Sequence, residues 1–312
     1  MNHPIKRLLQ TQPYLLLDGG LATELEGRGF DLADPLWSAR LLIENPEAIQ
    51  AVHRDYLAAG ADVIITASYQ ATLQGLMARG LSKTKSAELL RSSVNLAVDV
   101  RDRFSAENPN RHPLVAASVG PYGAYLANGA EYTGDYDLDR TGLRDFHRER
   151  WQLLAGSSAD LLACETIPSF IEMEALLDLL HVTPDQSAWF SFSCRDAQHI
   201  SDGTPIATCA KRLGSEAQVA AIGVNCTRPE FVAGLITQIR AVTEKPIVVY
   251  PNSGEGWDAV NKCWVGEEGD SAEIYAADAR QWHQLGATLI GGCCRTTPKH
   301  IQTIHHSLST AN

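Results

Sequence analysis

Eight short apolar runs recur along this chain of 312 residues, and segments with helical periodicity lie between most of them. The runs span residues 14–17, 62–67, 114–118, 160–163, 188–192, 220–224, 246–250 and 287–291. The helical segments span residues 45–59, 85–104, 143–157, 170–181, 230–242 and 272–285. Continuous apolar strands that alternate with helices are typical of a parallel sheet whose outer face the helices cover. Eight such units in a chain of this length predict a (β/α)8 barrel of the TIM type.

The alternative architecture is an open doubly wound sheet. Its dinucleotide-binding form carries a Gly-x-Gly-x-x-Gly turn after the first strand, and no such turn follows residues 14–17. No linker rich in Pro, Gly or Ser, no short-period repeat and no low-complexity segment divides the chain. We therefore predict one barrel domain that spans residues 1–312.

The composition limits the partners and the compartment. A formal net charge of -11 and the lack of a dense Lys/Arg run argue against nucleic acid or an anionic membrane surface as a partner. No apolar stretch is long enough to cross a bilayer. Seven cysteines are an odd number in a chain too long to need disulfides for stability. Free thiols in the cytoplasm are therefore the expectation.

Three cysteines stand where two of the apolar runs end. Cys226 follows the sixth run, and Cys293 and Cys294 follow the eighth. The active site of a (β/α)8 barrel lies at the carboxyl ends of its strands, and strands six and eight are about 10 Å apart there. Loop residues can close that gap around one ion. Three thiolates suit a zinc ion with an open fourth position, the arrangement of a catalytic site.

The adjacent pair sets a condition on the backbone. Successive side chains of a regular strand face opposite ways, so Cys293 and Cys294 share a metal only where the strand has already broken. Gly291 and Gly292 permit such a break. Buried free cysteines or a strained vicinal disulfide are the alternatives for the pair.

The other four cysteines have simpler expected roles, with one exception. Cys194 comes just after the fifth run, beside the sixth, and is a rival ligand for the metal. Cys164 is predicted to pack as a small hydrophobe. Cys209, in a predicted helix, and Cys263, in a long loop, are predicted to be structural or incidental.

Two carboxylates share the rim with the thiols. Asp18 ends the first run and Glu165 follows the fourth. They would repel a zinc-thiolate group unless they faced a cation, which a substrate ammonium would supply. The backbone N–H groups of Gly19, Gly20 and Leu21 are suited to a carboxylate. A plain turn at the first carboxylate and a helix entry at the second are the alternatives.

Aromatic residues also fall in the rim loops. They are Tyr69, Tyr122, Tyr125, Tyr132 and Trp257. Aromatic faces attract onium cations, although ordinary loop packing is the simpler role for any one of these rings.

Taken together, these residues resemble the homocysteine S-methyltransferase family. The matching segments read DGGLATEL at 18–25, ETIP at 165–168, GVNC at 223–226, YPNSGE at 250–255 and GGCCRTTP at 291–298. The resemblance covers essentially the whole chain. It implies one Zn²⁺ per chain held by Cys226, Cys293 and Cys294, with homocysteine against Asp18, Gly19 and Glu165. It also implies methyl transfer from S-methylmethionine, or S-adenosylmethionine, to the homocysteine thiolate to give methionine.

Two branches of that family differ from this chain. Betaine-using members carry a C-terminal extension for oligomerisation, and this sequence stops soon after Cys294. The homocysteine module of cobalamin-dependent methionine synthase is attached to further domains that this sequence lacks. Both departures favour a free-standing enzyme with a sulfonium donor, and the short C-terminal segment makes a monomer the expected state.

Several alternatives to this function stay open on the sequence alone. The donor could be betaine or another methyl carrier, and a selenium acceptor such as selenocysteine could compete with homocysteine. A non-catalytic zinc or thiol sensor would take Cys194 as its fourth ligand. A zinc-dependent barrel hydrolase is disfavoured, because no His-x-His follows the first strand.

Overall fold

The computed structural model describes residues 3–32, 40–254, 256–258, 263–265 and 271–310. Glu255, the last residue of one family segment, lies outside these ranges. The side chains of Trp257 and Cys263 are also not described, so the roles predicted for them stay predictions.

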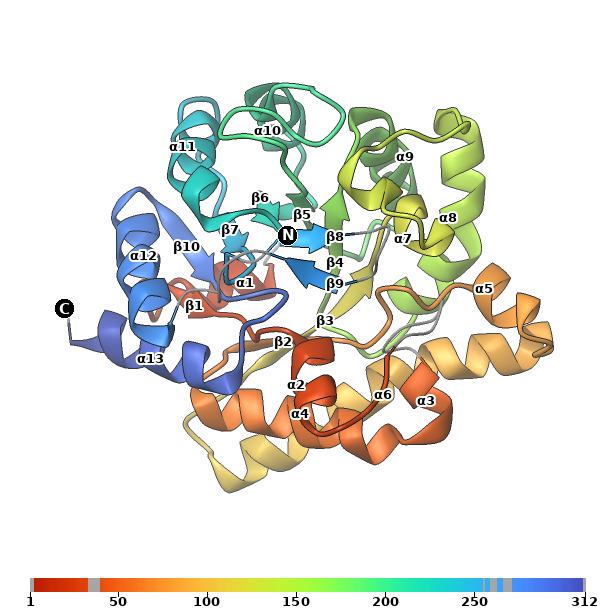
Figure 1. The fold of residues 1–312 in the computed structure, drawn as a ribbon, viewed down its shortest axis with the longest axis horizontal. Helices are drawn as coiled ribbons and strands as arrows, with labels where there is room; N and C mark the ends of the chain where they lie inside the picture. The colour runs from red at the N-terminus through yellow and green to blue at the C-terminus, as the bar shows by residue number, and fades with distance from the viewer. Residues whose placement is uncertain (1–2, 33–39, 255, 259–262, 266–270, 311–312) are drawn as a thin grey trace.

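Eight strands form one parallel sheet, in the order β1-β10-β7-β6-β5-β4-β3-β2. A parallel bridge between Leu17 and Val63 joins its two edges, with Asp62 N–H donating to Leu16 O at 2.7 Å and Asp18 N–H to Val63 O at 3.0 Å. Figure 1 shows the strands at the centre and the helices around them. The predicted (β/α)8 barrel is therefore confirmed.

All eight apolar runs form strands. The strands are β1 Leu15–Leu16, β2 Val63–Ile65, β3 Leu114–Val119, β4 Leu161–Ile167, β5 Ala188–Phe192, β6 Val219–Asn225, β7 Ile247–Tyr250 and β10 Ala287–Ile290. A separate antiparallel pair consists of β8 Gly256–Asp258 and β9 Cys263–Val265. Strand β4 extends beyond the predicted residue 163, so Glu165 lies inside the strand and the alternative of a helix entry at Glu165 is wrong.

The six predicted helices are confirmed, and further helices complete the ring. The main helices are α2 Leu21–Gly27, α4 Pro46–Ala59, α6 Lys83–Glu107, α8 Arg140–Ala155, α9 Phe170–His181, α10 Ile206–Gly214, α11 Pro229–Arg240, α12 Ala272–Gln284 and α13 Pro298–Ser309. Short ones are α1 Pro4–Leu8, α3 Leu41–Glu44, α5 Leu73–Ala78, α7 Tyr122–Leu126 and the 3₁₀ helix η2 Ala130–Tyr132. Side chains of Asn45, Ser169 and Ser271 accept from backbone N–H groups and so fix where α4, α9 and α12 begin.

The two faces of each strand pack into different cores. Leu15 and Leu17 point into the barrel, while Leu16 packs outward under the helices, as the two-residue period of a strand requires. Ile5 of α1 is fully buried in the inner core, and the side chain of His3 bonds to Ala217 O just before β6 begins. Helix α1 therefore covers the amino end of the barrel, which leaves the carboxyl end for ligands. Within the described ranges, no helix combines the length and apolarity needed to span a membrane.

Candidate active site

A cavity of about 470 Å³ opens at the carboxyl ends of the strands. Its walls include Asp18 after β1, Tyr69 after β2, Glu165 in β4, Cys226 after β6 and Cys293 after β10. The volume is typical of a small-molecule site. The predicted placement of thiols and carboxylates around one barrel rim is confirmed.

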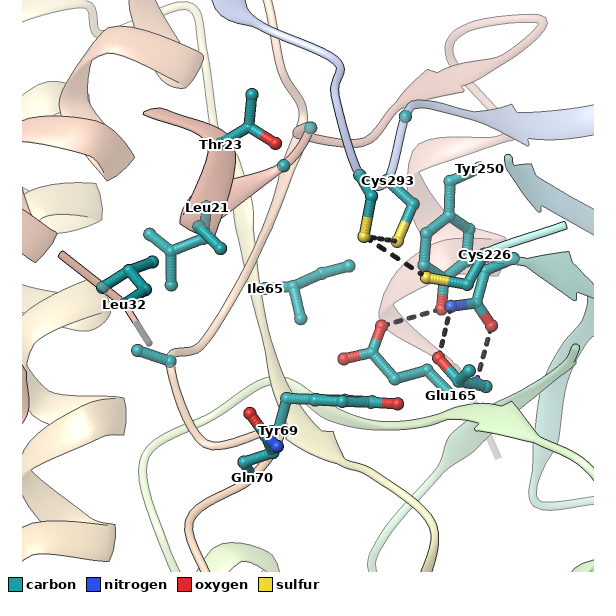
Figure 2. A pocket seen from close by; sticks show the side chains of 18 of the residues that line it. Leu21, Thr23, Leu32, Ile65, Tyr69, Gln70, Glu165, Cys226, Tyr250 and Cys293 are labelled. Atoms are coloured by element: carbon teal, nitrogen blue, oxygen red, sulfur yellow. Dashed lines mark hydrogen bonds between the residues drawn. The ribbon is translucent and has the colours of Figure 1, made fainter. Parts of the chain in front are cut away.

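The three predicted thiols converge in this cavity. The Sγ atoms of Cys226 and Cys294 are 3.8 Å apart, and those of Cys293 and Cys294 are 3.9 Å apart. Figure 2 shows the Cys226 and Cys293 sulfur atoms pointing toward each other. These distances exceed a disulfide bond of about 2.05 Å, so the vicinal disulfide alternative is wrong. They match the separation of about 3.8 Å between sulfurs that share a tetrahedral zinc with bonds of about 2.3 Å.

The predicted break in the eighth strand is present. The two glycines permit it by their lack of a side chain and not, as predicted, by their conformational freedom. Strand β10 ends at Ile290, and neither Gly291 nor Gly292 has a positive φ angle. A Cβ at Gly291 would lie 2.6 Å from the Leu17 Cβ, and one at Gly292 would lie 2.3 Å from the Thr296 Oγ1. Glycine is required here because the neighbouring chain leaves no room for a side chain.

Left-handed backbone conformations occur at two other strand ends. Thr166 has a φ of 58° and Cys226 a φ of 48°, which is uncommon for residues other than glycine. The Asn225 side chain makes two hydrogen bonds to Thr166. Its Oδ1 accepts from Thr166 N–H at 2.6 Å, and its Nδ2 donates to Thr166 Oγ1 at 2.7 Å. The amide of Asn225 therefore anchors the backbone next to Cys226 to the end of β4.

The three thiols differ in acidity. Hydrogen bonds from Cys293 and Cys294 lower the pKa of Cys226 well below its ordinary value, against the opposing effect of burial. Hydroxyl groups of Tyr132 and Thr166 contribute further hydrogen bonds to the same sulfur and lower the Cys226 pKa too. The pKa values of Cys293 and Cys294 are raised, first by their hydrogen bonds to Cys226. Cys226 is therefore the first of the three to become a thiolate.

The two predicted carboxylates are buried beside the thiols. Asp18 Oδ2 accepts from Ile65 N–H at 2.8 Å, and burial raises the pKa of Asp18 well above its ordinary value. Glu165 accepts from the Ser118 hydroxyl and, at 3.1 Å, from the Tyr250 hydroxyl, as Figure 2 shows for Tyr250. Burial raises the pKa of Glu165 to about 7 despite these bonds. Among the described residues, neither carboxyl group has a neighbouring cation that would keep it ionised.

One part of the predicted carboxylate-binding turn is wrong. The Gly20 N–H donates to the main-chain oxygen and to the Oγ1 of Thr296, both at 3.2 Å, so it does not face a ligand. A Cβ at Gly19 would lie 2.8 Å from that same Oγ1, and a Cβ at Gly20 would lie 2.7 Å from Cys293 O. The glycines let the turn after β1 pack directly against the thiol loop.

Cys194 is not a rival ligand in the described structure. Its Sγ bonds to Phe192 O at 3.8 Å, and the group of ligand atoms within 4.8 Å of one another comprises Cys226, Cys293 and Cys294. Cys164 and Cys209 are fully buried in the outer core, as predicted.

Sequence reasoning gave no role to several residues that hold the site, although Asn225 and Tyr250 stand in the quoted family segments. Ser118 and Tyr250 lie inside apolar strands, where a single polar residue gives little signal. Asn225 stands next to a predicted thiol and could have been identified from that position. Glu131 in η2 lines the cavity although it is far in sequence from each family segment. Of the rim aromatics, Tyr69 and Tyr132 line the cavity, whereas the others described, Tyr122 and Tyr125, pack against Phe146.

Fold and site together define a class: a (β/α)8-barrel enzyme with clustered cysteine thiols and buried carboxylates at the carboxyl ends of its strands. Residues 15–308 match the sequence profile described as homocysteine S-methyltransferase, and the chain belongs to that family. It is 51% identical over 306 residues to homocysteine S-methyltransferase YbgG of Bacillus subtilis (strain 168), covering 97% of this chain and 96% of that one.

Solved structures show the same relationship. The metallated form of the homocysteine methyltransferase MmuM from Escherichia coli superimposes with a TM-score of 0.88 at 48% identity, covering 97% of this chain and 99% of that one. Its oxidized form gives 0.89 at 48% identity with complete coverage of both chains. The family resemblance inferred from the sequence is therefore confirmed.

Proposed function

We propose that this enzyme transfers a methyl group from a sulfonium donor, S-methylmethionine or S-adenosylmethionine, to the thiolate of homocysteine in a zinc-dependent reaction that yields methionine. The convergence of Cys226, Cys293 and Cys294 in one cavity carries the proposal. Homocysteine methyl transfer itself agrees with family membership and with the relatives. The donor and the metal are the parts that need testing.

The thiol group suits one Zn²⁺ per chain. Three soft sulfur ligands favour zinc over hard cations such as Mg²⁺ or Ca²⁺, and the sulfur separations fit a tetrahedral sphere. When bound, zinc would keep the homocysteine sulfur deprotonated at neutral pH. Three protein ligands, with Cys194 outside the described group, suit a catalytic site better than the closed four-ligand site of a sensor.

Asp18 and Glu165 supply the amino-acid end of the site. Each is at least nine-tenths buried in the cavity wall, and a substrate ammonium between them would restore their ionised forms. Gly19 packs where any side chain would collide with Tyr56 and Thr296, so it keeps the wall beside Asp18 flat. These residues orient homocysteine with its sulfur toward the thiols.

The chemical step requires position more than proton transfer. A C–S bond forms between the homocysteine sulfur and the methyl carbon, and the electron pair of the breaking bond returns to the donor sulfur, which becomes a thioether. Opposite charges cancel in this step, so apolar walls such as Leu21, Leu32 and Ile65 favour it by excluding water. In-line placement of the two sulfurs contributes several kcal/mol more. No residue acts as a general base on the methyl group.

The test is methionine formation from homocysteine with S-methylmethionine, S-adenosylmethionine or betaine, each with and without a zinc chelator. We expect turnover with a sulfonium only, abolished by the chelator and by Cys226→Ala, which should also lose its zinc. Cys209→Ala, at a buried thiol outside the site, should keep both. Full activity in a zinc-free variant would contradict the proposal.

We further propose that residues 1–312 form one domain that works as a cytoplasmic monomer. The closed eight-stranded sheet supports one domain, and the free cysteines among the described residues support a reducing compartment; the monomer is tested by the mass of the protein in solution.

A further inference from the structure

The cavity is acidic well beyond what homocysteine needs. Its described lining contains five carboxylates and no Lys, Arg or His; the carboxylates are those of Asp18, Glu26, Asp31, Glu131 and Glu165. One substrate ammonium accounts for Asp18 and Glu165. Burial raises the pKa of Glu26, and the nearby Arg295 cation opposes that rise. In the part of the chain that the structure describes, no cation lowers the pKa of Glu131.

Glu131 presents an unpartnered oxygen. Its Oε2 is buried and has no hydrogen-bond partner among the described residues. Burial first, and then the charge of Cys226, raise the pKa of this carboxyl to about 7. A buried polar atom without a partner is unfavourable, and each such atom in a native protein needs an explanation, of which a functional role is one.

The backbone that carries Glu131 is held in place. Its carbonyl oxygen accepts from the Ser193 hydroxyl at 2.8 Å. Gly123 packs so closely against η2 that a Cβ there would lie 2.3 Å from the Glu131 nitrogen. The Glu131 side chain therefore extends from a fixed point on the cavity wall.

A buried polar network in α8 and α9 secures the flanks of this segment. Glu172 accepts from Tyr122 N–H at 2.6 Å and from the Tyr136 hydroxyl, one on each side of η2. The ring of His147 lies 2.8 Å from Glu172 and 2.8 Å from Arg150. The network connects the helices to the loop that carries Glu131.

Aromatic rings stand on the same side of the cavity. Glu131 is close enough to Tyr69 and Tyr132 for its charge to raise both phenol pKa values, after the larger effect of burial. Tyr132 and Cys226 line the same cavity, and the charge of Cys226 also raises the Tyr132 pKa, so the wall formed by these three residues lies beside the thiols. Uncharged phenol rings next to a carboxylate form a favourable site for an onium ion.

We infer that Glu131 is the counter-charge for the sulfonium centre of the methyl donor, with Tyr69 and Tyr132 as its aromatic walls; this inference rests on the proposed function. The donor sulfur has to lie in line with its methyl group and the attacking sulfur, which places the positive charge beside the thiols. Glu131 is the carboxylate on that side of the cavity which the homocysteine site does not use.

This role has a distinctive kinetic consequence. The sulfonium charge disappears as the methyl group moves, so Glu131 stabilises the bound donor more than the transition state. An interaction of this kind lowers KM without raising kcat. Removing the carboxylate should raise the KM for the donor and leave kcat equal or higher.

The experiment is calorimetric binding to the zinc-loaded enzyme without homocysteine, so that no turnover occurs. The probes are S-methylmethionine and 2-amino-5-methylhexanoic acid, its isostere, in which an uncharged CH group replaces the sulfonium sulfur. The wild-type protein should prefer the sulfonium, and Glu131→Gln should weaken sulfonium binding about tenfold or more while isostere binding changes less than twofold. Tenfold corresponds to about 1.4 kcal/mol. Glu149→Gln, at an exposed carboxylate on α8, is the matched control and should change neither.

The outcomes separate this inference from the proposed function. Equal binding of the two probes by the wild-type protein overturns the inference and needs no variant. Equal weakening of both probes by Glu131→Gln, or loss of zinc or of homocysteine affinity, also overturns it. If sulfonium binding depends on Glu131 but methionine never forms, the inference holds and the proposed function fails. If methionine forms and Glu131→Gln has an unchanged donor KM, the proposed function holds and the inference fails.

Discussion

At the scale of single residues, the thiol position is set by backbone conformations that most side chains avoid. Cys226 and Thr166 both have positive φ angles, and Asn225 bonds to Thr166 through both atoms of its amide. Such conformations cost of order 1–3 kcal/mol each and persist only where the surroundings enforce them. Asn225 therefore contributes to the site through geometry, although its own side chain is not a candidate metal ligand.

Glu165 gives a prediction at this scale. Glu165→Gln removes the negative charge but keeps the size of the side chain next to Ser118 and Tyr250. We expect the KM for homocysteine to rise about tenfold or more, because a hydrogen bond to a charged group contributes about 1.5–3 kcal/mol. Zinc content, measured by atomic absorption, should not change. An unchanged KM would remove Glu165 from the substrate site.

His53 gives a second residue-scale prediction, on stability. This side chain of α4 is fully buried, and its two ring nitrogens have no hydrogen-bond partner among the described residues. Burial lowers the pKa of His53 to about 4 from an ordinary value of 6.5. The unfolded chain therefore binds the proton more tightly. Above about pH 6.5, His53 is neutral in both states and does not lower the free energy of unfolding. As the pH falls from 6.5 toward 4, the unfolded chain takes up the proton and the free energy of unfolding decreases.

The variant that checks this is His53→Leu, studied by urea unfolding between pH 7.5 and 4.5. Relative to the wild type, its free energy of unfolding should rise by up to about 1.4 kcal/mol for each pH unit below 6.5. His306→Gln, at an exposed position on α13, should follow the wild-type curve. Parallel curves for His53→Leu and the wild type would show that His53 does not titrate in this way.

At the scale of elements, α8 and α9 do more than cover the barrel. Their buried residues His147, Arg150 and Glu172 bond to one another and to the loops after β2 and β3, where Arg150 donates to Tyr69 O and Gly120 O. Loop position is therefore coupled to helix packing. This coupling predicts that a change in the helices alters the cavity wall.

Glu172→Gln tests that coupling. The substitution removes the negative charge that Glu172 places near buried Arg150 through His147, and a buried charge left uncompensated costs several kcal/mol. We expect a lower free energy of unfolding in denaturant and a raised KM for the sulfonium donor, with zinc content unchanged. Glu88→Gln, at an exposed carboxylate on α6, should change stability by less than about 1 kcal/mol. Lost stability with an unchanged donor KM would show that the network is only structural.

At the scale of the whole molecule, the barrel could be predicted because its strands are buried on both faces. Such strands form continuous apolar runs, which stand out from amphipathic helices without reference to any contact. The shorter helices were less visible: α2, α5 and α7 span only 7, 6 and 5 residues, too few turns for a clear period. The bridge between Leu17 and Val63 closes the sheet into a barrel. The number of strands predicts this closure, whereas no local sequence pattern does.

The sequence by itself determined the eight strand-helix units and the residues at their carboxyl ends, including Asp18, Glu165 and the three thiols. Strand periodicity and chain order are enough for that, because all parallel strands deliver their carboxyl ends to one rim. Only the tertiary structure decided which groups at the rim face a ligand. Gly20 bonds to Thr296 across 276 residues, and Cys194 turns away from the thiols. These choices depend on strand register and side-chain direction across the closed barrel, which no local pattern specifies.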